Sequence, residues 1–551
     1  MPHQLIIFAI VAFAITTIIT ITSSISSKRR RIAALKAAYG KPPAVDDFIQ
    51  MESIGRYAKY FETHTPTPQR VDPITWNDLD MDNVFNRINS CQTSVGEEYL
   101  YHCLHELPLN NQALAKRESL IQFFTDNPDE RLAVQDLFAS HMGKENYNGL
   151  TALMFAPNIS LLKYPHLYTV LAALPLLLSL VLIINVPIGV ICLVAAFVVN
   201  MMVYYRTKTH IAIEIPSIKY LTNLLRCCKG LCKIKTLAPQ PVMGDIRRYY
   251  KSLKSVKRNI PVASSMTGEI AESLFEYVNI LFLFDIRNFN KFMKIIKERS
   301  EEFHALYRAF GEIDMSICIA SFRHSLPEYS QPEFSKENEL NFTDMYHPLI
   351  STPITNSGAI NNNSLITGSN ASGKSTFIKA LAINCILAQT INTCAAKTFK
   401  ARFSLVMTSM VMRDDLSGGD SYFIVEIKSL KRIIDLSQEY PCTCFIDEIL
   451  RGTNTIERIA ASAAVLEYLK EQNVLCIAAS HDIELTRILE KYDNYHFREQ
   501  VTDDGIVFDY KLKNGPSTTR NAIKLLRFMG FEEDIVKRAE GLAEEYTQTS
   551  E

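Results

Sequence analysis

The stretch that decides the fold of the C-terminal part of the chain is Ser364-Leu365-Ile366-Thr367-Gly368-Ser369-Asn370-Ala371-Ser372-Gly373-Lys374-Ser375-Thr376. Its first four residues predict an apolar strand, and a helical pattern over Phe377–Gln389 follows directly. The stretch fits G-x-x-x-x-G-K-[S/T] in the strand–loop–helix context that this pattern requires. Glycines let the backbone curl so that successive N–H groups point at phosphate oxygens, and the helix amino terminus adds positive potential. We therefore predict a loop that binds a nucleoside triphosphate.

Lysine and hydroxyl side chains give this loop its predicted chemistry. Lys374 is expected to neutralise charge on the β- and γ-phosphates, and the Ser375 hydroxyl is expected to ligate Mg²⁺. The other predicted contacts to the nucleotide come from the rest of the loop: Gly368, Ser369, Asn370, Ala371, Ser372, Gly373 and Thr376.

An acidic strand end downstream is predicted to complete the site. Cys442–Ile446 is an apolar run that predicts a buried strand, and it ends in Asp447-Glu448. Asp447 is placed to hold Mg²⁺ through water. Glu448 can act as the general base that polarises the attacking water.

A third apolar strand is predicted over Val474–Ser480, and it ends at His481. Functional residues gather at the carboxyl ends of strands in parallel sheets, so His481 is expected to donate a hydrogen bond to the γ-phosphate. A surface or capping histidine is the alternative. The polar segment 414–421 precedes a helix predicted over Tyr422–Leu436. That segment is either an anion-binding element that closes over a partner's nucleotide or an ordinary loop and N-cap.

The chain has 551 residues, enough for roughly three to four domains, and its 47% hydrophobic content excludes global disorder. Helical periodicity covers Trp76–Leu161 and His210–Arg323, whereas short apolar runs alternate with helical stretches from Ser364 onward. We predict a multidomain fold with an α-helical core and lever region, transmembrane helices and a C-terminal α/β P-loop domain. The predicted boundaries are a membrane anchor at 1–27, a linker at 28–75, a helical core at 76–161, a transmembrane hairpin at 162–206, a helical region at 207–340 and the α/β domain at 341–551.

Three apolar stretches predict membrane spans. Gln4–Ser27 lacks charged residues and is followed by Lys28–Arg31, which by the positive-inside rule places the amino terminus outside the cell. The uncharged run Tyr164–Tyr205 is about twice the length of one span, and a proline-containing break divides it into Leu167–Ile184 and Ile188–Tyr205. We predict a multi-pass protein of the cell membrane with its α/β domain in the cytoplasm. A buried helical hairpin in a soluble core is the alternative.

A local excess of positive charge follows the hairpin. The whole chain has a net charge of −1, so its composition indicates no nucleic-acid partner. Arg206–Arg258, however, contains thirteen Lys or Arg residues against two acidic residues. Juxtamembrane cations attract anionic membrane lipid, and the same charges can track DNA phosphates. The position of this basic stretch next to the hairpin favours lipid over DNA as its partner. A solvated helix face without a partner is the third interpretation.

Together these motifs resemble the MutS family of DNA mismatch-repair ATPases, which belongs to the ABC ATPase superfamily. Thr367–Thr376 is similar to the family's T-G-P-N-M-x-G-K-S-T, although Ala371-Ser372 departs from it, and Asp447–Thr455 matches D-E-x-x-R-G-T-x-T. The other similar stretches are Asp414-Asp415-Leu416 with Ser421–Glu426, to D-D-L…S-T-F-x-V-E, and Ser480-His481 with Glu484-Leu485-Thr486, to T-H-x-x-E-L-T.

The resemblance extends upstream of the α/β domain. Thr93-Ser94-Val95-Gly96 and Arg117 are similar to the family's core domain, and Gly311-Glu312-Ile313-Asp314 looks like its junction between lever and ATPase domain. No stretch before Trp76 has room for the family's mismatch-reading domain. The resemblance therefore implies ATP chemistry and does not imply mismatch recognition.

The resemblance also implies roles for single residues. Ser421 would reach the ATP of a second subunit, His481 would be a switch histidine, and Tyr510 would stack on adenine. The implied assembly is a homodimer that uses ATP and Mg²⁺, with double-stranded or branched DNA as a candidate partner.

Two other functions fit the motifs. Leu416–Asp420 resembles the L-S-G-G-Q signature of ABC transporters, although three spans are fewer than one transporter half needs. The second alternative is a membrane scaffold whose assembly is controlled by nucleotide.

Overall fold

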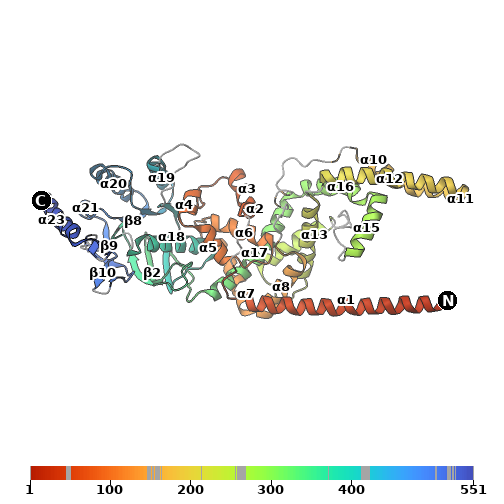
Figure 1. The fold of residues 1–551 in the computed structure, drawn as a ribbon, viewed down its shortest axis with the longest axis horizontal. Coiled ribbons are helices and arrows are strands. Elements are labelled where there is room, and N and C mark those ends of the chain that lie inside the picture. Colours follow the sequence, from red (N-terminus) through yellow and green to blue (C-terminus); the bar gives the residue numbers. More distant parts are fainter. Residues whose placement is uncertain are drawn as a thin grey trace. The chain divides into compact units, whose positions relative to one another are not determined.

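The computed structural model describes residues 2–44, 51–144, 151, 154, 162, 164–211, 214–254, 256, 269–369, 372–410, 422–502, 505–517, 523, 526, 527 and 529–549. The chain divides into two compact units. The helical unit comprises Met1–Pro66, Ile88–His102 and Ala115–Ser325. The α/β unit comprises Thr67–Arg87, Cys103–Leu114 and Leu326–Glu551. A helical amino-terminal region and a C-terminal α/β region were both predicted, and both are confirmed (Figure 1).

Helices dominate the described part of the first unit (Figure 1). The interval 28–75, which the sequence predicted as a linker, contains helical segments. The first helix, α1, continues from the predicted anchor through the basic cluster to Ala38. The helices are α1 (Pro2–Ala38), α2 (Met51–Ile54), α3 (Arg56–His64), α6 (Ser94–His105), α7 (Gln112–Asp126), α8 (Pro128–His141), α10 (Pro165–Ser179), α11 (Val181–Ile184), α12 (Val186–Ile211), α13 (Glu214–Leu231), α14 (Pro241–Leu253), α15 (Glu269–Phe282), α16 (Phe284–Glu298) and α17 (Ser300–Ser325).

Two stretches that resemble the family's core and junction meet in the buried centre of the helical unit. On α17, the Asp314 carboxylate accepts hydrogen bonds from the backbone N (2.9 Å) and Oγ1 (2.7 Å) of Thr93 at the start of α6. Gly96 lies against the same carboxylate, where a β-carbon would come within 2.3 Å of Oδ2. Arg117 pairs with Glu312 at 2.9 Å. The two stretches thus form one polar contact, and burial raises the pKa of Asp314 to about 6.

Helices α10, α11 and α12 form an apolar hairpin. Two stretches, Pro165–Ile184 and Val186–Thr209, are long and apolar enough to cross a membrane, with mean hydropathies of 2.6 and 2.5. At the tip, Ile183 is 83% and Ile184 is 86% exposed. The break at Asn185 agrees with the predicted division of this region. For the first predicted span, the side chains of residues 1–17 and 20 lie outside the described set.

An asparagine within the hairpin compensates for a proline. Pro175 lies inside α10 and has no N–H, so the carbonyl of Leu171 four residues earlier loses its helical donor. The buried Asn200 of α12 donates from Nδ2 to that carbonyl at 3.1 Å. The same nitrogen donates to the carbonyl of Leu281, at the end of α15, at 2.8 Å. Asn200 therefore ties both hairpin helices to the corner between α15 and α16.

The α/β unit is organised around two sheets. A six-stranded sheet has the order β12-β9-β4-β8-β7-β6, and β9 through β6 in that order run parallel, as predicted for a largely parallel sheet. A four-stranded sheet has the order β1-β5-β2-β3, and β10 pairs with β11. The strands predicted over Ser364–Thr367 and Val474–Ser480 are confirmed. The strands are β1 (Glu333–Ser335), β2 (Leu340–Met345), β3 (Asn356–Ile360), β4 (Ser364–Thr367), β5 (Thr398–Arg402), β6 (Leu405–Ser409), β7 (Cys442–Asp447), β8 (Val474–Ser480), β9 (Asp493–His496), β10 (Glu499–Thr502), β11 (Gly505–Phe508) and β12 (Lys513–Asn514).

Helices α18 and α19 confirm the helices predicted after the glycine-rich loop and after segment 414–421. The helices of the α/β unit are α4 (Pro73–Asp78), α5 (Met81–Ile88), α18 (Lys374–Ile391), α19 (Tyr422–Ser437), α20 (Thr455–Lys470), α21 (Glu484–Ile488) and α23 (Glu533–Thr549). The unit also begins earlier than the predicted boundary at 341, since β1 and the segment with α4 belong to it.

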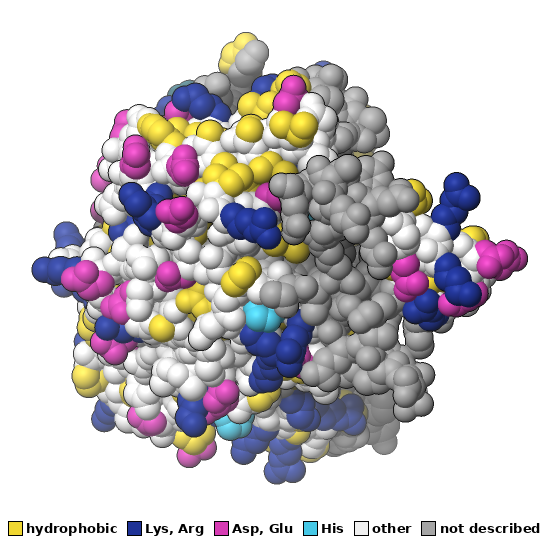
Figure 2. Space-filling view, turned by 90° about the vertical axis from the view of Figure 1, so that its left-hand side faces the viewer, with side chains coloured by type: hydrophobic (Ala, Val, Ile, Leu, Met, Phe, Trp, Pro, Cys, Tyr) yellow, Lys and Arg dark blue, Asp and Glu magenta, His cyan; other side chains and the backbone are white. Residues whose placement is uncertain are grey.

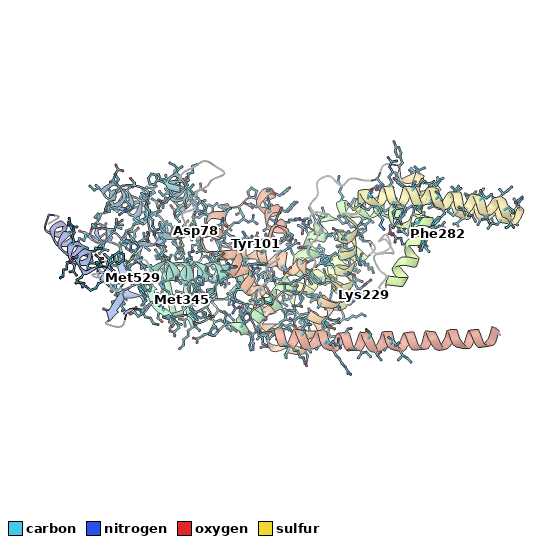
Figure 3. All side chains as sticks on the ribbon, in the orientation of Figure 1. Asp78, Tyr101, Lys229, Phe282, Met345 and Met529 are labelled. Carbon is cyan, nitrogen blue, oxygen red and sulfur yellow. The ribbon has the colours of Figure 1, made fainter. Side chains whose placement is uncertain are left out.

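The short helix α4 covers the outer edge of the six-stranded sheet at β6. The backbone N of Thr408 donates to Oγ1 of Thr75 at 3.1 Å. Oδ2 of Asp78, labelled in Figure 3, accepts from the Thr408 hydroxyl at 2.7 Å and from the backbone N of Met410 at 2.9 Å. An edge strand otherwise leaves such groups without partners. These contacts therefore fix segment 67–87 to the sheet despite its distance in sequence.

Replacement of Asp78 by Ala is expected to destabilise the α/β unit by about 2–4 kcal/mol, because the Thr408 hydroxyl and the Met410 amide would be buried without an acceptor. Urea unfolding followed by the fluorescence of Trp76 measures this, since Trp76 is the chain's single tryptophan and lies in α4. The exposed Asp126→Ala is the control. Equal midpoints for the two variants would contradict the assignment.

Candidate nucleotide-binding site

The loop between β4 and α18 contains two positions that require glycine. Gly368, directly after β4, has a φ of +144°, and a β-carbon there would lie 2.5 Å from the carbonyl oxygen of Phe497. Gly373, directly before α18, has a φ of +97°, and a β-carbon there would lie 2.8 Å from the ring of Tyr510. Side chains other than hydrogen are disfavoured in both conformations. Each of the two glycines of the predicted pattern is therefore required by a close contact of its own: Gly368 by the Phe497 carbonyl and Gly373 by the Tyr510 ring.

Lys374 is buried at the start of α18, and its ammonium group faces back into the loop. Its Nζ donates to the carbonyl oxygens of Gly368 (2.5 Å) and Ser369 (2.7 Å). The Ser372 hydroxyl donates to the same Ser369 carbonyl at 2.7 Å. A buried positive charge thus lies inside the curl of the loop at a helix amino terminus, where an anionic phosphate is favoured.

The remaining predicted contacts of the loop fall into two groups. Ser375 is half-buried and Thr376 is exposed, and both lie in the first turn of α18. Asn370, Ala371 and the predicted trans-acting Ser421 lie outside the described residues.

Asp447 ends β7 with an unsatisfied carboxylate. Strand β8 lies between β4 and β7, so the glycine-rich loop and Asp447 both emerge at the carboxyl edge of the sheet. Oδ1 of Asp447 is buried and has no hydrogen-bond partner among the described groups. A buried oxygen without a donor is costly, and a hard cation or its water removes that cost. The donor set of a carboxylate and the Ser375 hydroxyl fits Mg²⁺, which is usually held by one or two carboxylates together with substrate phosphates.

Glu448 and His481 are in direct contact. Nε2 of His481 lies 2.7 Å from Oε1 of Glu448, and the guanidinium of Arg451 binds the other carboxylate oxygen. Burial lowers the pKa of His481, and the positive charge of Lys374 lowers it further. These two effects favour the neutral imidazole. The structure thus brings the two residues together, as their positions at strand ends predicted.

The backbone after β7 is held in an unusual conformation. Glu448 and Leu450 both have a φ of +57°, which non-glycine residues seldom adopt. The carboxylate of Glu426, on α19, accepts a hydrogen bond from the backbone N of Leu450. Burial raises the pKa of Glu426. The sequence placed Glu426 in a matching motif and gave it no role; an acid between Val425 and Ile427 was the available signal.

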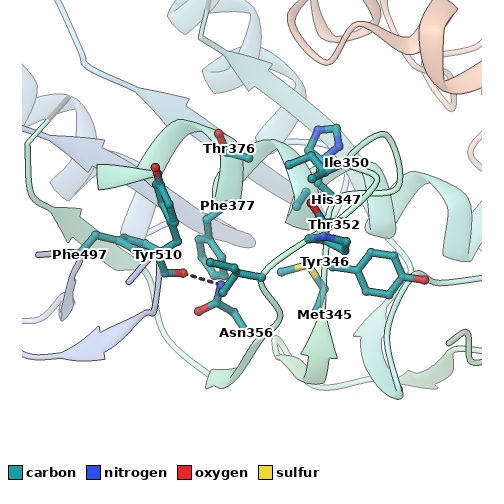
Figure 4. Close-up of a pocket in the computed structure, with 14 residues that line it drawn as sticks. Met345, Tyr346, His347, Ile350, Thr352, Asn356, Thr376, Phe377, Phe497 and Tyr510 are labelled. Carbon is teal, nitrogen blue, oxygen red and sulfur yellow. Dashed lines mark hydrogen bonds between the residues drawn. The ribbon is translucent and has the colours of Figure 1, made fainter. Parts of the chain in front are cut away.

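A cavity of about 320 Å³ lies beside the loop (Figure 4). The predicted adenine-stacking residue, Tyr510, lines it and is 41% exposed. Burial lowers the pKa of the lining residue His347 to about 4, so its ring is neutral. The backbone N of Leu349 donates to Nδ1 of His347 at 3.3 Å, which leaves Nε2 as the protonated nitrogen. The aromatic lining also includes Tyr346, Phe377 and Phe497.

Comparison with known proteins places this geometry in a family context. Residues 364–547 match the domain family described as MutS domain V. The chain is 28% identical over 320 residues to a DNA mismatch repair protein MutS from Finegoldia magna, covering 55% of this chain and 37% of that protein. It is 31% identical over 248 residues to human MutS protein homolog 4, covering 41% of this chain and 26% of the relative. A MutS protein from Bacillus licheniformis is 28% identical over 297 residues, or 51% of this chain and 34% of the relative.

These similarities support a relation to the MutS family, and the match to its domain V lies within the α/β unit. They give no support to the ABC-transporter alternative. The chain spans about a quarter to somewhat over a third of the length of these relatives, so the activity of a complete MutS protein does not transfer to it directly.

Proposed function

We propose that this chain, whose α/β unit is similar to MutS proteins, is a Mg²⁺-dependent ATPase that acts on DNA as a membrane-anchored homodimer. One observation carries the ATPase proposal. The carboxyl ends of neighbouring strands β4, β7 and β8 bring together the buried Lys374, the Glu448–His481 pair and Asp447, whose Oδ1 has no hydrogen-bond partner among the described groups. This is the combination that phosphate binding, metal binding and activation of water require.

The residues at the carboxyl edge of the six-stranded sheet bind different parts of the nucleotide. Ser375 and Asp447 would hold Mg²⁺, which supplies charge neutralisation and polarisation of the phosphates when bound. When the nucleotide binds, the Lys374 ammonium group gives up its hydrogen bonds to the carbonyl oxygens of Gly368 and Ser369 and binds β- and γ-phosphate oxygens instead. The backbone amides of the loop orient the same oxygens, and the cavity beside Tyr510 receives the base.

Glu448 and His481 act on the reacting end of the nucleotide. In the present arrangement the Glu448 carboxylate is held by His481 and Arg451. To act as a general base it must instead accept a proton from the attacking water. His481, once turned from Glu448, has a neutral N–H that donates to the γ-phosphate, and the contact between the two residues therefore couples nucleotide sensing to the base.

Lys374→Ala is expected to lower ATP affinity at least ten-fold, because it removes the buried cation of the loop. Glu448→Gln is expected to retain ATP binding and lose about 10²–10⁴-fold in turnover, the usual contribution of a positioned general base. Equilibrium binding of ATP and steady-state phosphate release measure the two effects. Lys537→Ala, an exposed change on α23, is the control.

The same Glu448→Gln variant also tests the homodimer. The likeness of Ser421–Glu426 to the family signature supports a site shared between two chains, with Ser421 reaching the partner's nucleotide. A variant that binds ATP without hydrolysing it should sediment as a dimer with ATP and as a monomer without it. Unchanged ATP affinity in Lys374→Ala would contradict the binding site, and a monomer at saturating ATP would contradict the shared site.

Exposed cations on the helical unit support DNA as a partner. The end of α13 and one face of α14 carry exposed Lys229, Lys233, Arg247, Arg248 and Lys251. By contrast, acidic side chains lie among the basic ones on the face of the α/β unit seen in Figure 2. On α14 these cations outnumber the exposed acid, Asp245, and an excess of positive charge suits a phosphate backbone. The matched relatives that are named as DNA mismatch repair proteins point the same way.

DNA affinity of the full chain in detergent is expected to fall steeply with salt, about 10³-fold between 50 and 200 mM if six phosphates are contacted. The triple change Arg247→Gln, Arg248→Gln, Lys251→Gln should weaken binding and reduce the salt slope. Homoduplex, mismatched and branched DNA should be compared with and without ATP. If no DNA binds but vesicles with anionic lipid do, the basic surface serves the membrane, and the scaffold function gains support.

The apolar hairpin and α1 support a multi-pass location in the cell membrane, with the α/β unit in the cytoplasm. No charged side chain interrupts Tyr164–Tyr205, and Lys208 at the base of the hairpin pairs with Glu276 at 2.8 Å. The exposed isoleucines at the tip have no reason to face water. Insertion of the hairpin into lipid removes these apolar side chains from water.

Alkaline carbonate extraction is expected to leave the full chain in the membrane pellet. A variant lacking 2–27, and a variant in which 165–209 is replaced by a Gly-Ser linker, should each stay in the pellet, because one anchor remains. The variant with both changes should be released. Release of the unmodified chain would show that the hairpin belongs to a soluble core.

A further inference from the structure

The backbone around Tyr510 is fastened by the side chain of Asn356, across the cavity rim (Figure 4). Nδ2 of Asn356 donates to the carbonyl oxygen of Tyr510 at 3.0 Å. Oδ1 of Asn356 accepts from the backbone N of Leu512 at 2.8 Å. One amide group therefore satisfies two backbone groups on the carboxyl side of Tyr510.

Only an amide side chain can make this pair of contacts. Asparagine presents one donor and one acceptor in the geometry of a peptide group, whereas an ionised Asp has no donor and Leu has neither. Asn356 is 8% exposed, so water is poorly placed to replace a lost bond. The loss of either contact thus leaves a backbone group unsatisfied.

The contact also joins the two sheets of the α/β unit. Asn356 begins β3 and is paired with Met345 of β2 in the four-stranded sheet. The backbone that it holds leads directly into β12, at the edge of the six-stranded sheet. The cavity is lined from both sides of this junction, so Asn356 helps to fix its width.

The backbone conformation of Tyr510 is unfavourable, so contacts with neighbouring residues must stabilise it. Its φ is +50°, a left-handed conformation that is uncommon for a bulky residue and persists only when its surroundings determine it. In this conformation the ring lies against Gly373 of the phosphate-binding loop and stacks on Phe508 at a centroid distance of 5.8 Å. A relaxed backbone at this position would move the ring away from the loop.

We propose that Asn356 is a positioning residue for the nucleobase. It holds Tyr510 in the left-handed conformation that presents the ring to a base in the cavity, and so it makes the site prefer a nucleoside triphosphate over a bare polyphosphate. This inference rests on the proposed ATP function. It assigns base recognition in part to a residue outside every matched motif.

Binding of ATP and of inorganic tripolyphosphate to the full chain, both with Mg²⁺, tests the proposal. Asn356→Asp should lower ATP affinity about ten-fold, the value of one aromatic–base stack, and leave tripolyphosphate affinity unchanged. Tyr510→Ala should show the same selective loss. The double variant should lose no more than Tyr510→Ala alone, because both changes remove one interaction.

Asn363→Asp is the matched control. Asn363 is also buried, and its Oδ1 likewise accepts a backbone hydrogen bond, from Cys476 at 2.9 Å, but it does not line the cavity. This variant should leave the ratio of ATP to tripolyphosphate affinity unchanged. Asn356→Ser, which keeps a small polar group, provides a second variant should Asn356→Asp fold poorly, and it should show a partial selective loss.

The outcomes separate this inference from the function on which it rests. An unchanged affinity ratio in Asn356→Asp, or a double variant whose losses add fully, overturns the role of Asn356 while ATP binding stands. If the unmodified chain binds neither ATP nor tripolyphosphate, the proposed function itself fails.

Discussion

The pairing of β8 with both β4 and β7 is the contact on which the candidate site depends. Thr367 pairs with Ser480, and Asp447 pairs with Ala479, so three strand ends lie level at one edge of the sheet. Every residue of β8 is buried, and the hydrogen-bonded ladders on its two sides fix this register. A slip of one residue would turn Asp447 to the opposite face and separate it from the loop.

Polar side chains then fix the conformation of segments around the sheet whose position the strand pairing alone does not determine. Glu426 holds the left-handed turn after β7, and Asn356 holds the left-handed Tyr510. Asp78 closes the edge strand β6. Each of these groups is wholly or largely withdrawn from water, where an unmade hydrogen bond is costly. The site is therefore defined by a few buried polar contacts between distant segments, in addition to its recognisable motifs.

In the helical unit, too, buried polar side chains form hydrogen bonds with backbone groups of distant segments. Pro175 removes a donor inside α10, and Asn200 replaces it while also reaching α15. The Asp314 carboxylate similarly fastens the start of α6 to the long helix α17. The Asn200 contacts join both hairpin helices to the end of α15.

The sequence alone determined the elements whose signal is local. The strand and helix around the glycine-rich loop, the strands ending at Asp447 and His481, and the apolar hairpin all follow from runs and periodicities within some twenty residues. The glycine pattern likewise predicted where the backbone must curl. Tertiary structure decided the rest, because it depends on contacts between residues hundreds of positions apart. The helix α4 is an example, since it is fixed by packing and by bonds to Thr408 that no local pattern reveals. Asn356 is another: an asparagine alone has an ordinary turn-like sequence signal, and only the folded chain sets its amide against the backbone carbonyl of Tyr510.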